Sequence, residues 1–405
     1  MALVAFRHRD ITVKLFNQQS FTVKVIREAH LKAAAVSSSN QSRKPRTKFI
    51  SESFKKDEIE DHLLKKRLIE GTGGTKKHHI FNQLYPWKTR LELAEHLKKS
   101  EVYNKDGLIA ICKPYGIAKS KVNEAMKKDK STVVQTLSSG GYPAHTPCLE
   151  ETLPILQDMY KTRDLEIVKC TERWTSGLVL LSSKKEMSQK VQKCFRRSKA
   201  FKRPPLSYWA VTVGSPAPET IKTKVGISLD HVDGVGKVPV IRKKYKMAEV
   251  DRGEVKLAVV KHSTLFHNLL NDAALVEVEI QTLKWHFLRV WLAHCCSPVL
   301  GDPFYSGRVR YIFDRKIQVS PHNPAAHHPL EISNKICQLL ELPKDTPEII
   351  PSLIHLAKIR LSSFNKDKTD LVLTTQPPHH FSWACEKMGI MSANELNIFE
   401  EETVQ

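Results

Sequence analysis

The sequence predicts an α+β fold with a mixed, largely antiparallel central sheet flanked by helices, and three observations indicate it. Apolar runs of strand length recur from residue 106 onward, bounded by Gly, Pro, Ser or charged residues. Only a few helix-like stretches lie among them, which favours this arrangement over repeated βαβ units. No Gly-x-Gly-x-x-Gly pattern follows a strand, so a dinucleotide-binding fold has no support.

The expected elements begin with two charged helical stretches, at 57–70 and 89–99. The glycine-rich run between them, residues 71–76, lacks P-loop spacing and is interpreted as a turn. Strands are expected at 107–112, 165–168, 177–181, 208–213 and 275–280. Helices are expected at 184–199 and directly after Trp285.

The composition is that of a soluble globular protein, with 41% hydrophobic and 26% charged residues among 405. No apolar run is long enough for a membrane span. Eight cysteines are too few for a disulfide scaffold, and no Cys-x-x-Cys pair occurs. Their use argues against a structural zinc site and favours a reducing compartment.

The charge balance points to a polyanionic partner, because Lys and Arg number 64 against 43 acids, a net charge of +21. Two basic clusters, 193–203 and 242–246, are expected to contact the phosphates of a nucleic acid. The alternatives are a solvated basic surface, or a basic targeting tail that raises the total.

Four regions are predicted. Residues 1–50 are rich in Arg and Ser and poor in acids, which is typical of a mitochondrial transit peptide or of a disordered basic arm. Residues 51–100 are a charged helical extension, 101–390 the main domain, and 391–405 an acidic tail.

Four segments of the main domain carry the functional signal. They are KPYG at 113–116, ERWTSGL at 172–178, LSYWAV at 206–211, and HFLRV at 286–290, which leads on to PVLGDPFY at 298–305. This ordered set resembles the RluA-type pseudouridine synthase family, over about residues 106–389. The basic N-terminus makes the mitochondrial branch, the RNA pseudouridylate synthase domain-containing proteins, the most similar one.

The resemblance implies the pseudouridine synthase fold, with a central RNA cleft. It implies an isomerase that converts uridine to pseudouridine in mitochondrial mRNA or rRNA without cofactor or metal, and so supports mitochondrial translation. The expected location is the mitochondrial matrix, and the expected partners are RNA and proteins of RNA granules or ribosome assembly.

The resemblance also assigns residues. Glu172 stands at the position of the family's aspartate, the nucleophile or sugar-directed base, with Arg289 as its ion partner. Tyr208 is expected to stack on uracil and to handle a proton. The residues expected to bind substrate are Lys113, Arg173, Lys284 and His286.

Two departures affect the expected activity. The family aspartate is Glu172 here, one methylene longer, and a misplacement of about 1 Å can cost on the order of 100-fold in rate. The family's His-Arg-Leu is replaced by Lys-Cys-Thr at 169–171. Cys170 therefore occupies the position of the arginine that helps displace the target base, and it supplies no cation.

Structural alternatives stay open for the three catalytic candidates: Glu172 as a solvated loop acid, Tyr208 as a packing residue, and Arg289 as a helix-surface cation. The leading hypothesis is an RNA pseudouridine synthase. The alternative is a catalytically impaired RNA-binding factor in mitochondrial RNA processing or ribosome assembly. A third interpretation is a basic protein that binds other proteins through its acidic tail.

Overall fold

The computed structural model describes residues 79–391, except 88, 121–146, 283, 314 and 344–345. The predictions for 1–50, 57–70, 71–76 and the acidic tail beyond 391 therefore lie outside the described residues. Among the helices that are described, none has the length and apolar character needed to cross a bilayer.

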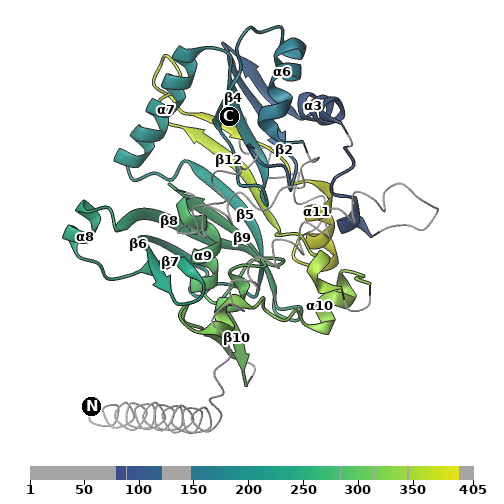
Figure 1. Ribbon diagram of the computed structural model, residues 1–405, viewed down its shortest axis with the longest axis vertical. Coiled ribbons are helices and arrows are strands. Elements are labelled where there is room, and N and C mark those ends of the chain that lie inside the picture. Colours follow the sequence, from purple (N-terminus) through teal and green to yellow (C-terminus); the bar gives the residue numbers. More distant parts are fainter. Residues whose placement is uncertain are drawn as a thin grey trace, which may run out of the picture. The chain divides into compact units, whose positions relative to one another are not determined.

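A mixed sheet forms the centre of the described fold (Figure 1). Its path is β1-β2-β4-β12-β5-β9-β8-β6-β7, with β3 paired to β4 and β13 paired to β12. The β4–β12 pair is parallel and the other pairs are antiparallel. The strands are β1 (Glu101–Lys105), β2 (Leu108–Lys113), β3 (Glu166–Lys169), β4 (Ser176–Ser182), β5 (Leu206–Val213), β6 (Thr220–Val232), β7 (Gly236–Arg242), β8 (Val255–Asn268), β9 (Ala273–Ile280), β12 (Ile354–Leu361) and β13 (Leu371–Thr374).

This sheet confirms the predicted fold class, and the five predicted strands are β2, β3, β4, β5 and β9. Sequence reasoning missed β6, β7 and β8, in which Lys, Thr, Ser or His side chains interrupt the apolar residues. A separate hairpin joins β10 (Val309–Ile312) to β11 (Arg315–Gln318).

Helices cover both faces of the sheet. They are α3 (Arg90–Lys99), α6 (Leu149–Tyr160), α7 (Lys185–Ala200), α8 (Met247–Asp251), α9 (Phe287–His294), α10 (Asn334–Leu339) and α11 (His379–Lys387). Helix α3 begins where Thr89 accepts the backbone N–H of Glu92 at 3.1 Å, as expected of an N-cap. Helix α7 buries Met187, Val191 and Cys194, which lie on one helical face.

The alternation of side chains along the strands divides the core between the two faces. Leu108 and Ala110 of β2 share a buried cluster with residues of α7 and α9. Their neighbours Ile109 and Ile111 pack with α3 and α6 instead. Residues of α10 and α11 cover part of the sheet around β5 and β9. The middle strands β4, β12 and β5 are therefore enclosed from both sides.

The parallel β4–β12 contact depends on a glycine. Gly177 has φ +118°, and a Cβ atom there would lie 2.4 Å from the carbonyl oxygen of Leu356. Only a residue without a side chain permits this approach of the two backbones. The contact fixes the start of β4, and with it the loop that carries Glu172.

Candidate active site

A small cavity at the centre of the sheet brings together three predicted catalytic residues. Its volume is about 10 Å³, room for about one water molecule. The lining residues come from the loop before β4, from β5, from the start of α9 and from β12: Glu172, Thr175, Tyr208, His286, Leu288, Arg289 and Ile354.

A buried lysine forms hydrogen bonds that hold the loop that carries Glu172. Lys113, at the end of β2, has no exposed surface, and its Nζ donates to the carbonyls of Thr175 (2.8 Å) and Ile117 (2.9 Å). The backbone N–H of Gly116 also donates to the carbonyl of Arg173 at 2.8 Å. The KPYG turn and the Glu172 loop therefore form one hydrogen-bonded unit.

Arg289 has a different ionic partner from the one predicted. Its Nε and Nη2 donate to the two carboxylate oxygens of Asp302 at 3.0 and 2.5 Å, and both side chains are buried. No ion pair joins Arg289 to Glu172 within the described residues. The prediction of a direct Glu172–Arg289 pair is wrong because Asp302 presents both of its oxygens to the guanidinium fork.

Asp302 also orders the chain that follows it. Its Oδ1 accepts the backbone N–H groups of Phe304 (2.9 Å) and Tyr305 (3.1 Å). Burial alone would lower the pKa of Arg289, but the Asp302 carboxylate raises it overall. Arg289 is therefore a permanent buried cation beside the cavity.

Glu172 titrates near neutral pH. The residue keeps partial exposure, yet the surrounding protein desolvates its carboxylate and raises its pKa to about 7. The positive charge of Arg289 opposes this rise, and the negative charge of Asp302 adds to it. Both the protonated and the ionised form of Glu172 are therefore present near neutral pH.

Tyr208 lies on β5 with its ring buried in the core and one part of it against the cavity. Its hydroxyl is buried and has no hydrogen-bond partner among the described residues. Burial, with the nearby Glu172, raises the pKa of this phenol well above its usual value. A buried hydroxyl without a partner costs about 1–3 kcal/mol, so a ligand that forms a hydrogen bond with Tyr208 would recover that free energy.

His286 closes the cavity at the start of α9. Its Nδ1 lies 2.8 Å from the Tyr305 hydroxyl, and burial lowers its pKa to about 3, so the ring is neutral. Trp285 and His286 both adopt left-handed backbone angles, with φ of 56° and 54°. Such residues cost of order 1–3 kcal/mol each, which indicates a constrained entry into the helix.

The structure does not bring every predicted substrate-binding residue to the cavity. Lys113 is a buried support, as described above. Arg173 is buried too, with its Nε donating to the carbonyl of Gly116 (3.3 Å) and its guanidinium 4.2 Å from the Trp174 ring. Lys284 is exposed and does not line the cavity.

Sequence reasoning missed the ionic role of Asp302 and the position of Ile354. Asp302 belongs to the segment PVLGDPFY, and the motif by itself assigns it no cation. An acid that follows a buried Val-Leu-Gly run was the available signal, because a carboxylate in that setting needs a cation. For Ile354 no such signal exists, since an apolar strand residue is ordinary core.

Comparisons with known proteins agree with this fold and site. Residues 107–294 match the family model described as RNA pseudouridylate synthase. The human mitochondrial mRNA pseudouridine synthase RPUSD3 is 26% identical, covering 75% of this chain and 79% of that protein. The bovine mitochondrial pseudouridylate synthase RPUSD4 is 25% identical, covering 77% and 75%.

The bacterial ribosomal large subunit pseudouridine synthase C of Rickettsia prowazekii is 26% identical, over 51% of this chain and 56% of that protein. The solved structure of human RNA pseudouridylate synthase domain containing 4 superposes with a TM-score of 0.53 and 22% identity. It covers 75% of this chain and 97% of that one, and shows a common fold.

The fold and the matched region define an RNA pseudouridylate synthase domain. The family model over residues 107–294 and the similar relatives confirm the resemblance to RNA pseudouridylate synthases that the four motifs carry.

Proposed function

We propose that this chain is an RNA pseudouridine synthase, an isomerase that converts uridine to pseudouridine in mitochondrial RNA. The observation that carries the proposal is one cavity that collects Glu172, Tyr208 and Arg289 from three separate elements of the family fold. The names of the relatives support a mitochondrial location and an mRNA or rRNA substrate. Within this proposal the protein acts in the matrix, where such an RNA serves mitochondrial translation.

The reaction needs one carboxylate and no cofactor. Ionised Glu172 either bonds to C1′ as the bond between C1′ and N1 of uridine breaks, and leaves C1′ again when C5 attacks it, or it takes the C2′ proton as the C1′–N1 bond breaks and returns that proton when C1′ bonds to C5. The uracil turns while it is bound, C1′ bonds to C5, and the proton on C5 is lost as N1 gains one. The uridine and its product therefore have the same atoms.

Arg289 acts through its charge. Asp302 holds the guanidinium in place. The positive charge of Arg289 favours the ionised form of Glu172. Tyr208 supplies a ring against which the uracil rests, and a hydroxyl that can bond to the base as it turns. The hydroxyl that has no partner in the protein then finds one in the substrate.

The cavity must widen before a uridine enters. A volume of about 10 Å³ is far below the roughly 300 Å³ of small ligand pockets. The target nucleotide must also leave its stack, which costs a few kcal/mol. Binding energy from the rest of the RNA has to supply both.

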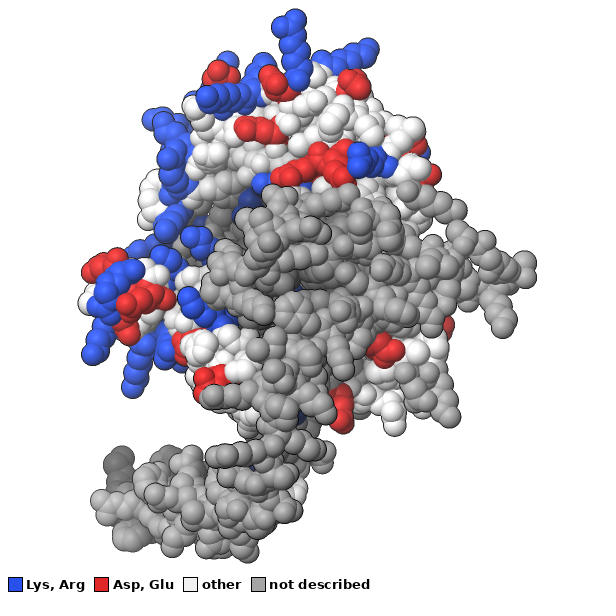
Figure 2. Space-filling view, viewed as in Figure 1, with Lys and Arg blue, Asp and Glu red and all other residues white. Residues whose placement is uncertain are grey.

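A basic surface supplies that binding energy. Lys and Arg side chains gather on the side of the fold where α7 and α8 lie (Figure 2). The exposed cations there include Lys193, Arg196, Lys199, Lys243 and Lys244. Arg242 is partly neutralised by Asp230, at 2.8 Å. Phosphate contacts with these side chains position an RNA without reading its sequence.

The direct test is the reaction of purified protein with mitochondrial RNA, followed by pseudouridine mapping. Glu172→Ala should abolish the signal at every site that the wild-type protein modifies. The matched control is Glu166→Ala, which removes an exposed acid six residues earlier and should leave the signal unchanged. Modification by Glu172→Ala at the wild-type level would contradict the role of Glu172.

A second function, an RNA-binding factor with little catalysis, is favoured by two observations. Glu172 has no direct cationic partner among the described residues, and its pKa of about 7 keeps part of the population protonated near neutral pH. In this case Glu172→Ala binds RNA and rescues cells that lack the protein, whereas charge reversal at Arg196 and Lys243 does not.

A further inference from the structure

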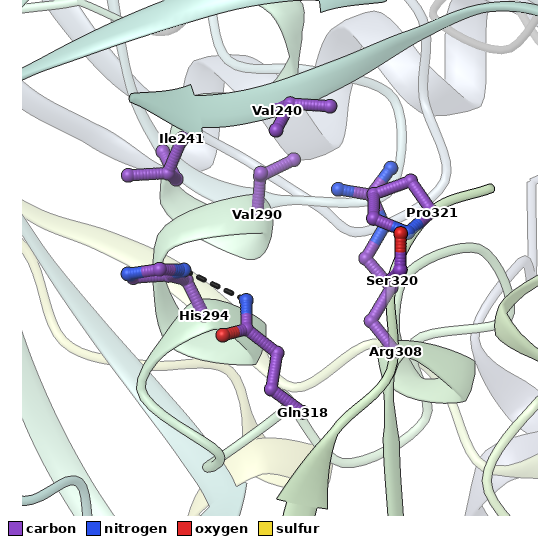
Figure 3. Close-up of a pocket in the computed structure, with 8 residues that line it drawn as sticks. All are labelled: Val240, Ile241, Val290, His294, Arg308, Gln318, Ser320 and Pro321. Carbon is purple, nitrogen blue, oxygen red and sulfur yellow. Dashed lines mark hydrogen bonds between the residues drawn. The ribbon is translucent and has the colours of Figure 1, made fainter. Parts of the chain in front are cut away.

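A second and larger cavity is lined in part by Val290 and His294 of α9 (Figure 3). Its volume is about 370 Å³, within the range of small-ligand sites. It is lined by residues of β7, of α9 and of the segment around the β10–β11 hairpin: Val240, Ile241, Val290, His294, Arg308, Gln318, Ser320 and Pro321.

Arg308 gives this cavity a buried positive charge. The side chain is 6% exposed, and its Nη1 donates to the carbonyl of Pro239 at 2.6 Å. It forms no ion pair with a described carboxylate, and its other guanidinium nitrogens donate no hydrogen bond to a described residue. The carboxylates of Asp302 and Asp230 act on this charge without forming an ion pair with it, so the buried guanidinium still favours an anionic group from outside.

The opposite wall is apolar. Val240, Ile241 and Val290 line one side of the cavity, and Gln318 and Ser320 line the other (Figure 3). The amide of Gln318 donates to Nδ1 of His294 at 2.7 Å, and its oxygen accepts no hydrogen bond from a described residue. The cavity thus combines an apolar surface, a hydrogen-bond acceptor and a cation, and no acid lines it.

This cavity is a close neighbour of the candidate active site. Arg289 lines the small cavity, and the next residue, Val290, lines the large one. The Tyr305 ring lies between them, with its centroid 5.5 Å from the Arg289 guanidinium and 4.8 Å from that of Arg308. Strand β7 also runs from Val240 directly into the basic residues 242–246.

We propose that this cavity binds one unpaired nucleotide of the RNA substrate, other than the uridine that is isomerised. The base lies on Val240, Ile241 and Val290, and its polar edge meets Gln318. The phosphate binds Arg308. The inference rests on the proposed function, and it makes this cavity a determinant of which RNA is chosen, since base contacts specify while phosphate contacts position.

The test fills the cavity from its rim. Ser320 is exposed, so Ser320→Trp places an indole in the cavity with little effect on folding. We expect about ten-fold weaker binding of substrate RNA, in line with the loss of one base contact, and an unchanged rate at saturating RNA. The matched control is Gln338→Trp, an exposed residue of α10 that lines neither cavity. Binding by Ser320→Trp equal to the control would overturn the proposal.

Photocrosslinking separates this inference from the proposed function, because it requires no catalysis. Full-length protein is irradiated with a random-sequence RNA pool that contains 4-thiouridine, and the crosslinked peptides are mapped. Crosslinks at residues 318–321 that disappear in Ser320→Trp and weaken in Arg308→Gln support the site. The absence of crosslinks at residues 318–321 would reject the nucleotide site, even if pseudouridine forms. Crosslinking there that free mononucleotides suppress and unlabelled RNA does not would also reject it.

Discussion

Glu172 carries the sharpest prediction at the scale of single residues. Its pKa of about 7 means that the ionised, reactive form increases as the pH rises through neutrality. We expect single-turnover rates to climb about ten-fold per pH unit below pH 7 and to level off above it. Rates that stay flat or fall between pH 5.5 and 8.5 would contradict a catalytic carboxylate at this position.

Stability provides an independent measure of the same group. Because the folded pKa lies above the usual 4.5, the folded protein binds more protons than the unfolded chain between about pH 4.5 and 7. Glu172 therefore lowers the free energy of unfolding as the pH rises through this window. Glu172→Gln should unfold like the wild-type protein at pH 4.5 and be more stable by ~1–3 kcal/mol at pH 8.

Tyr208 separates function from stability. Its buried hydroxyl has no partner, so Tyr208→Phe should leave stability unchanged or raise it by about 1 kcal/mol. The same change should lower the rate of isomerisation by about 100-fold, because the hydroxyl no longer handles a proton. Urea unfolding and single-turnover kinetics measure the two effects.

Tyr305→Phe is the control for Tyr208→Phe. Its hydroxyl lies 2.8 Å from Nδ1 of His286, so its loss should destabilise the fold by about 1 kcal/mol. A Tyr208→Phe variant that is destabilised to the same extent, with unchanged kinetics, would show that Tyr208 is only a packing residue.

At the scale of elements, the parallel β4–β12 contact positions the catalytic loop. Gly177→Ala places a Cβ 2.4 Å from the carbonyl oxygen of Leu356 at a φ of +118°. Both strain and overlap follow, with an expected loss of ~2–4 kcal/mol in chemical denaturation. Activity should fall with it, since the Glu172 loop leads into this strand.

A second glycine isolates the two effects. Gly253 has φ +77°, and a Cβ there meets only the flexible end of Lys256. Gly253→Ala should therefore cost only the backbone strain, about 1–2 kcal/mol, and leave activity intact. Equal losses of stability and activity in the Gly177→Ala and Gly253→Ala variants would mean that the close approach of β4 to β12 does not position the catalytic loop.

At the scale of the whole molecule, the charge of +21 should appear as salt-dependent RNA binding. Each phosphate contact adds about 0.7–0.9 to the slope of log affinity against log salt. Replacing Lys193, Arg196 and Lys199 on α7 by Gln should reduce that slope by roughly 2 to 3. The control replaces three exposed cations near α3 and α6: Lys99, Lys105 and Arg163. An equal reduction in both triple variants would mean that the α7 surface has no special role.

The sequence determined the fold class, the resemblance to RNA pseudouridylate synthases and the residues around the small cavity. Short apolar runs mark the strands of a buried sheet, because alternation and turn residues are local properties. The motif order then predicted Glu172, Tyr208, His286 and Arg289, and these four side chains do meet at one cavity. The motifs predict these contacts because each motif residue lies on a strand or on the loop next to it.

Only the tertiary structure decided how those residues are paired. Asp302, thirteen residues after Arg289, takes the guanidinium that was assigned to Glu172. Lys113 and Arg173 are turned into the protein, where their hydrogen bonds support the loop. Ion pairs and burial depend on which chains approach in three dimensions, and a one-dimensional pattern does not contain that distance. For the same reason the large cavity around Arg308, built from three separate segments, becomes visible only in the folded chain.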